Sequence, residues 1–281
     1  MVNPWMGMCL VVSIFAVLMI SLQVYRRSRS KDPELVRKLL HIGMGLVTLT
    51  LPWLFSTIWP VLLLTVGFTL FLTALRFCRP LQRLFGGVID GVARQSMGEI
   101  YFPLAVGLVF VLSAGDPITF CIPMLILALA DASAALIGKR YGTLRYATAD
   151  GEKSVEGSIA FLIVALLSTQ IPLLLFTDTG RAESLVIALT LSLFVMLLEA
   201  IAWRGLDNLF VPLGAFFLLR SFLKMDVSAL TAHLGIAVVL VMLSVLFRPQ
   251  RAIARQARPM SHRMPAKNLA AARGGHQLWS N

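Results

Sequence analysis

The chain has 281 residues, of which 58% are hydrophobic and only 14% are charged, and its mean hydropathy is +0.82. Because about a quarter of the residues of a soluble domain are charged, this composition excludes a soluble globular protein and predicts an integral membrane protein. The three cysteines are scattered without a C-x-x-C pair, which argues against a zinc site or a disulfide framework.

Hydropathy predicts an all-α bundle of about seven to nine transmembrane spans, which form a single catalytic domain over residues 1–247. In chain order, the apolar segments are 5–25, 39–56, 58–75, 101–114, 117–138, 157–177, 183–202, 209–223 and 229–247. Two of them, 101–114 and 209–223, are short and contain Pro103 and Pro212. Each of these two is expected either to cross the membrane or to form a broken or re-entrant segment.

The basic residues predict the orientation. They follow the first apolar segment instead of preceding it, which indicates a retained helix with its N-terminus outside rather than a signal peptide. If all nine segments cross, one side of the membrane receives 22 of the 25 Lys and Arg residues. The positive-inside rule makes that side cytoplasmic. We therefore expect a protein of the bacterial inner membrane, with its C-terminus and its active site on the cytoplasmic side.

Two of the early apolar segments begin with candidate site residues. The second follows Arg37-Lys38 and contains His41, so Arg37 and His41 share a helix face one turn apart. Lys38 is a candidate both for anchoring the helix at the interface and for contacting phosphate. Glu99 stands at the mouth of the fourth segment, where we expect it on the substrate side.

Asp131 is the most informative residue, because it lies inside the fifth apolar segment. Moving an aspartate toward the bilayer centre costs at least about 2.5 kcal/mol, so this carboxylate needs a cation, a metal or a hydrogen-bond donor. Ala134, Ala135 and Gly138 lie on its helix face, a spacing that also favours close packing of two helices. Such packing explains the small residues but not the aspartate, so we expect a functional role for Asp131.

Basic and polar residues follow Asp131 toward the sixth apolar segment. Lys139 and Arg140 come first, and Lys153-Ser154-Val155-Glu156-Gly157-Ser158 leads directly into the segment. A helix N-terminus offers unpaired N–H groups and a partial positive charge, which favour phosphate. The alternative is an ordinary helix cap, with Ser154 at the N-cap position and Glu156 in the first turn.

The seventh apolar segment ends near Glu199, and the short loop after it carries Asp207 and Asn208. Carboxylate and amide oxygens suit Mg²⁺ or a ribose. An Asp-Asn turn before a helix is the alternative interpretation of that pair.

Residues 248–281 hold seven basic residues and no acid, and we expect a disordered cytoplasmic tail. Juxtamembrane basic clusters are attracted to anionic lipid headgroups by about 1 kcal/mol per charge. Nucleic-acid binding is not favoured, since no aromatic platform or binding motif accompanies these residues.

Together these segments resemble the group of polytopic lipid-alcohol kinases that contains dolichol kinase, phytol kinase and CTP-dependent diacylglycerol kinase. The matching residues span about 37–213 and are Arg37-Lys38-x-x-His41, Gly98-Glu99 with Tyr101-Phe102-Pro103-Leu104, Asp131-x-x-Ala134-Ala135-x-x-Gly138 with Gly142, Lys153-Ser154-x-Glu156-Gly157-Ser158, and Glu199 followed by Asp207-Asn208. The chain length and the Gly-Glu-Ile-Tyr-Phe-Pro segment are most similar to phytol kinase.

The resemblance implies a kinase that transfers the γ-phosphate of CTP, or of ATP, to a lipid alcohol such as phytol or a polyprenol, with Mg²⁺ as cofactor. The roles we expect are catalytic for Asp131, Lys153, Glu156 and His41, phosphate-binding for Lys139, Arg140, Ser154, Gly157, Ser158, Arg37 and Lys38, metal-binding for Asp131, Glu156, Glu199 and Asp207, and substrate-side for Glu99 and Asn208. Asp131 either binds the metal or activates the lipid hydroxyl. The lipid and the oligomeric state stay open.

Two other functions compete with this interpretation. A cytidylyltransferase that makes a CDP-lipid is similar in its Asp and Lys-x-x-Glu-Gly residues, but this chain lacks the Arg-Asp-x-x-Asp-Ser signature of that family. A transporter would also place ionisable groups in membrane helices. The candidate residues gather at one face, however, and the sequence contains no visible inverted repeat.

Overall fold

The computed structural model describes residues 3–29, 33–78, 97–148 and 151–246, and the predicted tail 248–281 lies outside them. The elements are α1 (Pro4–Arg29), α2 (Pro33–Thr48), α3 (Leu51–Leu54), α4 (Ile58–Phe77), α6 (Gly98–Ser113), α7 (Pro117–Leu125), the π-helical segment η1 (Ile126–Ala130), α8 (Asp131–Tyr141), β1 (Arg145–Thr148), β2 (Gly151–Ser154), α9 (Val155–Phe176), α10 (Arg181–Ile201), α11 (Asp207–Phe222) and α12 (Val227–Leu246). The predicted all-α bundle is confirmed.

Each of the nine predicted apolar segments coincides with helical structure, and seven spans in the described residues are long and apolar enough to cross a membrane. The two short segments, which contain Pro103 and Pro212, are continuous helices, α6 and α11, of 16 residues each. Pro103 and Pro212 are both buried among neighbouring helices. Such packing lets a membrane helix tolerate the N–H group that proline lacks.

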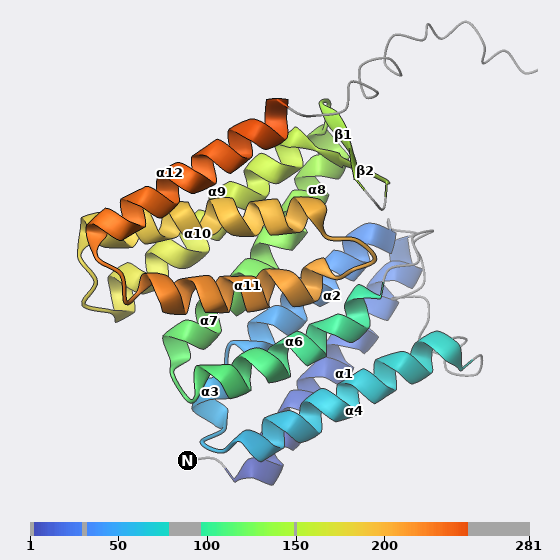
Figure 1. Cartoon of the computed structure of the whole chain (residues 1–281). Helices are drawn as coiled ribbons and strands as arrows, with labels where there is room; N and C mark the ends of the chain where they lie inside the picture. Colours follow the sequence, from blue (N-terminus) through green and yellow to red (C-terminus); the bar gives the residue numbers. More distant parts are fainter. Residues whose placement is uncertain (1–2, 30–32, 79–96, 149–150, 247–281) are drawn as a thin grey trace, which may run out of the picture. The chain divides into compact units, whose positions relative to one another are not determined.

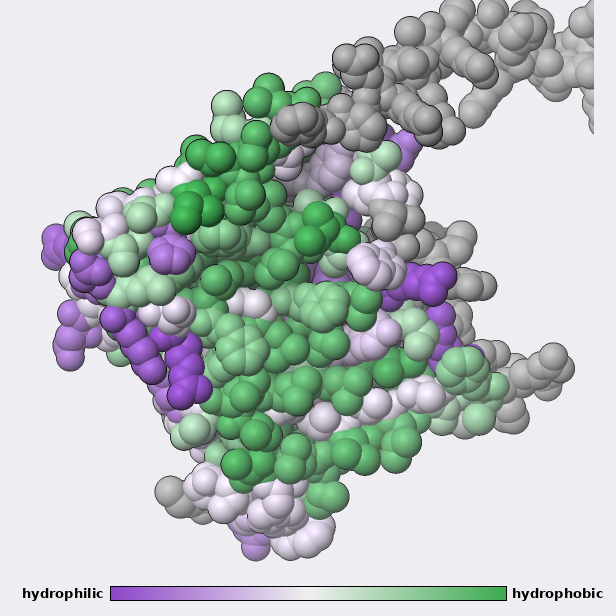
Figure 2. Space-filling model, viewed as in Figure 1, coloured by the Kyte–Doolittle hydropathy of each residue, from purple (hydrophilic) through white to green (hydrophobic). Residues whose placement is uncertain are grey.

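The surface of the described residues fits a bilayer. Hydrophobic side chains cover the face formed by α4, α6, α11 and α12, and hydrophilic residues gather toward the two ends of the helices (Figure 2). Aromatic side chains suited to a membrane interface are exposed near both ends, and they are Trp5, Trp53 and Trp59 at one end and Tyr25, Tyr141 and Trp203 at the other.

Neighbouring helices run side by side in the order α4, α6, α11, α10 and α12 (Figure 1). Behind them, α2 contacts α1, η1 and α8, and α9 contacts α7, η1, α8 and α10. The central segment α7–η1–α8 therefore packs against α2, α9 and α11. This arrangement surrounds the first residue of α8, Asp131, with helices from both halves of the chain.

The fifth predicted span differs from a simple helix. It is divided by the π-helical turn Ile126–Ala130 directly before Asp131. Short π-helical segments occur frequently at functional sites. Close approach of α2 to this turn depends on Gly45, because a Cβ at that position would collide with Ala128.

A second difference is a small β-hairpin between α8 and α9. Strands β1 and β2 are antiparallel and pair Arg145 with Ser154 and Tyr146 with Lys153. The all-α prediction does not include this hairpin. The hairpin fixes the direction in which Lys153 leaves the backbone, just before α9 begins.

Candidate active site

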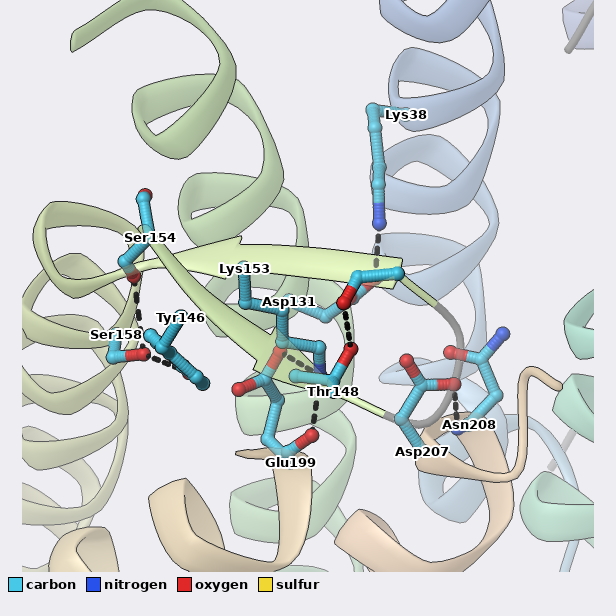
Figure 3. Close-up of polar contacts among 11 residues, drawn as sticks. Lys38, Asp131, Tyr146, Thr148, Lys153, Ser154, Ser158, Glu199, Asp207 and Asn208 are labelled. Atoms are coloured by element: carbon cyan, nitrogen blue, oxygen red, sulfur yellow. Dashed lines mark hydrogen bonds and ion pairs between the residues drawn. The ribbon is translucent and has the colours of Figure 1, made fainter. Parts of the chain in front are cut away.

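A buried ion pair joins α2 to α8. The Lys38 ammonium group lies 2.6 Å from Asp131 Oδ2, and only 5% of the Lys38 surface is exposed (Figure 3). The two residues are 93 positions apart in the sequence. This contact supplies the cation that an aspartate in an apolar span requires. Lys38 is therefore a partner of Asp131, and the expectation that it anchors the helix at the interface is wrong.

His41 lies beside this pair. Its Nε2 atom is 2.9 Å from the Leu127 carbonyl oxygen of the π-helical turn and 3.6 Å from Asp131 Oδ2. The ring also packs edge-on against Phe102 of α6, with ring centres 5.1 Å apart. A hydrogen bond to the Leu127 carbonyl requires the proton on Nε2, which leaves Nδ1 as the basic nitrogen of a neutral ring.

A second lysine–carboxylate pair links the hairpin to the end of α10. Lys153 Nζ lies 2.6 Å from Glu199 Oε1 and also donates to the Glu199 backbone carbonyl (Figure 3). The last carbonyl groups of a helix lack intrahelical partners and carry partial negative charge. Lys153 thus neutralises both a largely buried carboxylate and the C-terminus of α10.

The turn after α10 brings Asp207 and Asn208 to the same place. Arg204 and Gly205 adopt left-handed backbone conformations, with φ of 53° and 82°, which reverse the chain between α10 and α11. Asp207 Oδ1 then accepts a hydrogen bond of 2.9 Å from the Asn208 N–H. The Asp207 carboxylate lies within electrostatic range of Asp131, Lys38 and Lys153.

These contacts define the Asp131 cluster, which consists of Lys38, Asp131, Lys153, Glu199 and Asp207. Three acids and two lysines from α2, α8, β2, α10 and α11 share a largely buried space. Burying charge is costly unless each group is paired. The structure brings together Asp131, Lys153, Glu199 and Asp207 of the predicted site and adds Lys38 as a direct partner.

A second group of charges borders the cluster. Arg37 lies 3.8 Å from Glu99, and Arg76 at the end of α4 lies 4.0 Å from the same carboxylate. Arg37, His41, Glu99 and Asn208 also line one end of an apolar cavity between α1, α2, α4 and α6. Arg76 was not among the predicted site residues, although a lone arginine closing an apolar segment is a usable signal.

The N-terminus of α9 is capped by its own chain, as the alternative interpretation of the motif predicted. The Ser154 hydroxyl accepts a 3.0 Å hydrogen bond from the Gly157 N–H, and Val155 N–H donates to Leu144 O. Ser158 Oγ lies 2.7 Å from the Tyr146 hydroxyl of β1. These partners occupy the groups that we expected to hold phosphate, so that role of Ser154, Gly157 and Ser158 stays a prediction.

Gly157 also has a packing role. A Cβ at this position would lie 2.8 Å from the Ala134 carbonyl and 3.3 Å from Gly138 Cα. The small residues of α8 therefore let α8 and α9 approach closely, which is the packing that their spacing predicts.

Glu156 is held away from the cluster. One of its carboxylate oxygens accepts hydrogen bonds from Thr143 N at 2.9 Å, from Leu144 N at 3.1 Å and from the Thr143 hydroxyl. Its other oxygen is buried without a hydrogen-bond partner among the described atoms. Glu156 thus ties the start of α9 to the segment before β1, where it can position Lys153. The structure does not bring it to Asp131, as the predicted metal site required.

Lys139 and Arg140 lie in the last turn of α8 and are exposed. Lys139 lies eight positions after Asp131, which corresponds to about 12 Å along the helix. The Arg140 guanidinium lies 5.3 Å from the centre of the Tyr141 ring. The structure does not bring these two residues into the Asp131 cluster.

The described residues contain no group of three or more His, Cys, Asp and Glu side chains arranged to hold a metal ion. The oxygen ligands of Asp131, Glu199 and Asp207 nevertheless suit Mg²⁺, which usually takes one or two protein carboxylates together with substrate phosphates. Lysines already pair with Asp131 and Glu199. The donor set therefore fits an ion that arrives with a nucleotide better than a permanent metal centre.

Comparison with known proteins identifies the family. The chain is 30% identical over 213 residues to the phytol kinase of Synechocystis sp., and the match covers 75% of this chain and 89% of the relative. No family profile and no solved structure matches the chain. A match that covers most of both sequences extends well beyond a shared motif. The chain therefore belongs to the phytol kinase-like family of integral membrane lipid-alcohol kinases.

Proposed function

We propose that this protein transfers the γ-phosphate of a nucleoside triphosphate, with CTP as the first candidate, to the hydroxyl group of a prenol such as phytol. The Asp131 cluster beside an apolar cavity carries the proposal. Phosphoryl transfer depends mainly on positioning and on neutralising phosphate charge. Two lysines and three acids next to an apolar cavity suit a reaction between an anionic nucleotide and a lipid alcohol.

The two ion pairs supply the phosphate-binding groups. Lys38 and Lys153 each lie 2.6 Å from a carboxylate oxygen. Either lysine can bind a phosphate oxygen in place of the carboxylate, so that its positive charge stays paired with an anion. The exchange releases a carboxylate as each phosphate contact forms. Arg37, near the mouth of the cavity, is the third basic group within reach of the transferred phosphate.

Once Lys38 binds phosphate, Asp131 is available to the hydroxyl group of the lipid alcohol. In the transfer, the lipid oxygen bonds to the γ-phosphorus, the bond to the bridging oxygen breaks, and the nucleoside diphosphate leaves. The hydroxyl proton passes to Asp131 or to His41 Nδ1; His41 lines the polar end of the cavity, and its Nε2 atom lies 3.6 Å from Asp131 Oδ2. Bound Mg²⁺, with Asp131 and Asp207 as its candidate ligands, would neutralise phosphate charge.

The distribution of charge supports an active site on the cytoplasmic side of the bacterial inner membrane. The members of the Asp131 cluster and the basic residues Arg37, Arg76 and Arg204 all lie at or near the ends of helices that the positive-inside rule assigns to the cytoplasm. A soluble nucleotide would reach the cluster from that side, and the lipid would enter from within the membrane.

Product analysis tests the proposal. Purified protein in liposomes receives Mg²⁺, a prenol, and CTP labelled at either the γ- or the α-phosphorus, with ATP in a parallel series. We expect the γ-label in an organic-extractable prenyl phosphate and the α-label in the aqueous nucleoside diphosphate.

Two results would contradict it. Incorporation of the α-label into lipid, with release of pyrophosphate, would identify a cytidylyltransferase instead. Transfer of neither label with any alcohol and either nucleotide would reject the kinase, and uptake assays on the same liposomes would then test the transporter.

A further inference from the structure

An elongated apolar cavity lies between α1, α2, α4 and α6. Its empty space amounts to about 940 Å³, part of which is open to solvent. One wall is a single face of α2 that runs from Arg37 to Thr48. These residues are eleven positions apart, or about 16 Å along the helix axis. The cavity is therefore long enough for an extended hydrocarbon chain.

The two ends of this cavity differ in chemistry. Arg37, His41, Glu99 and Asn208 line one end, whereas Val11, Leu51 and Val61 line the other. The three apolar residues are almost fully buried, from which we infer that this end is closed. A suitable ligand has one polar end and one long apolar end.

The polar end of the cavity meets the Asp131 cluster. His41 lines the cavity, and its Nε2 atom lies 3.6 Å from Asp131 Oδ2. Between the two ends the wall is mostly apolar; its polar side chains are Thr65 and Thr48, and the Thr48 hydroxyl donates to Gly45 O of its own helix at 2.7 Å. A hydroxyl group at the polar end would thus lie beside the acid, with its chain directed toward Leu51.

We propose that this cavity binds the hydrocarbon chain of the lipid alcohol and that its closed end, formed by Val11, Leu51 and Val61, selects the chain length. The inference rests on the proposed kinase function and adds the location and the limit of the acceptor site. Closed apolar ends discriminate by volume, and one methylene group in a tight pocket changes kcat/KM by about tenfold or more.

Substitutions at the closed end test the inference. Leu51→Phe shortens the cavity and Leu51→Ala lengthens it, and kcat/KM is measured for farnesol, geranylgeraniol and a longer polyprenol. Leu51→Phe should lower the ratio of kcat/KM for geranylgeraniol to kcat/KM for farnesol by at least about tenfold. Leu51→Ala should move the preference toward the longer alcohol.

Leu46→Phe provides a matched control. Leu46 lies on α2 outside the cavity lining and is 49% exposed, so the same added ring should leave the chain-length ratios unchanged. If Leu51→Phe does not fold, Val61→Phe blocks the same end, and Leu51→Ala tests the opposite direction.

Failure of the inference is distinguishable from failure of the proposed function. Unchanged ratios in folded variants at Leu51 and Val61, with an active wild type, would overturn the chain-length role and leave the kinase intact. In that case the cavity would hold chains of the surrounding membrane lipids. A wild type that phosphorylates none of the alcohols would reject the kinase function, and the inference with it.

Discussion

Asp131 and Glu156 are carboxylates at the starts of two adjacent helices, α8 and α9, yet they have opposite surroundings. Asp131 meets the charged side chain of Lys38 at 2.6 Å and lies beside His41. Glu156 meets the backbone N–H groups of Thr143 and Leu144. One carboxylate holds a cation from a distant helix, and the other holds the chain that leads to its own helix.

This difference separates residues suited to reaction chemistry from residues that position the chain, within one set of motif residues. A lysine paired with a carboxylate can exchange that partner for a phosphate, so the pair can bind a substrate and release an acid. Hydrogen bonds from backbone N–H groups fix a loop and are not free to exchange in this way. We therefore assign reaction chemistry to the Asp131 cluster and structural support to the Glu156 contacts.

Removal of the Lys38 charge should have the largest effect on stability. Lys38→Met leaves the Asp131 carboxylate buried without its cation, which typically costs about 3–5 kcal/mol. The double variant Lys38→Met with Asp131→Asn removes both charges and should recover most of this loss, without recovering activity. Thermal unfolding in detergent measures both variants. An unchanged midpoint for Lys38→Met would contradict the buried pair.

Lys153 on the second strand of the hairpin and Lys139 on the helix before it should differ in their effect on turnover. Lys153→Ala removes a cation of the Asp131 cluster, and we expect kcat/KM for the nucleotide to fall by about a hundredfold. Lys139→Ala, on the exposed last turn of α8, should change it by less than about threefold. Equal losses in the two variants, measured by initial rates over a range of nucleotide concentrations, would remove the distinction between clustered and exposed lysines.

The smallest effect on chemistry is expected at Glu156. Glu156→Gln weakens the hydrogen bonds to Thr143 and Leu144, so the thermal midpoint should fall while kcat stays within about a factor of five of the wild type. Differential scanning fluorimetry and steady-state kinetics on one preparation give both values. A loss of activity as large as that at Lys153, with an unchanged midpoint, would place Glu156 in the reaction instead.

Much of the fold is predictable from the sequence, because long apolar segments leave few alternatives to membrane helices. The need of Asp131 for a partner is also predictable, since an acid in an apolar span is costly without one. The identity of that partner is not, because Lys38 lies 93 positions away and hydropathy does not specify the rotation of α2 about its axis. For the same reason, the sequence does not reveal that Lys153 joins the Asp131 cluster while Lys139 stays exposed.

The local irregularities are harder to predict. Nothing in the apolar sequence around residues 126–130 distinguishes a π-helical turn from an α-helix. The hairpin has a weak signal, since an Asp-Gly pair at 150–151 is typical of a tight turn between strands. The pattern of Ser154 and Glu156 fits both a helix cap and a phosphate site, and the contacts of their side chains favour the cap.

The most direct test of the central claim is transfer of the γ-label by Asp131→Asn under single-turnover conditions, with Glu156→Gln measured beside it. The substitution removes the negative charge that Asp131 contributes to the cluster. It keeps the size of the side chain and an oxygen that can accept the Lys38 hydrogen bond, which limits the loss of stability. We expect Asp131→Asn to remain folded while the rate of transfer to the prenol falls by about a thousandfold, and Glu156→Gln to remain active. Transfer by folded Asp131→Asn at a rate close to that of the wild type would contradict the account.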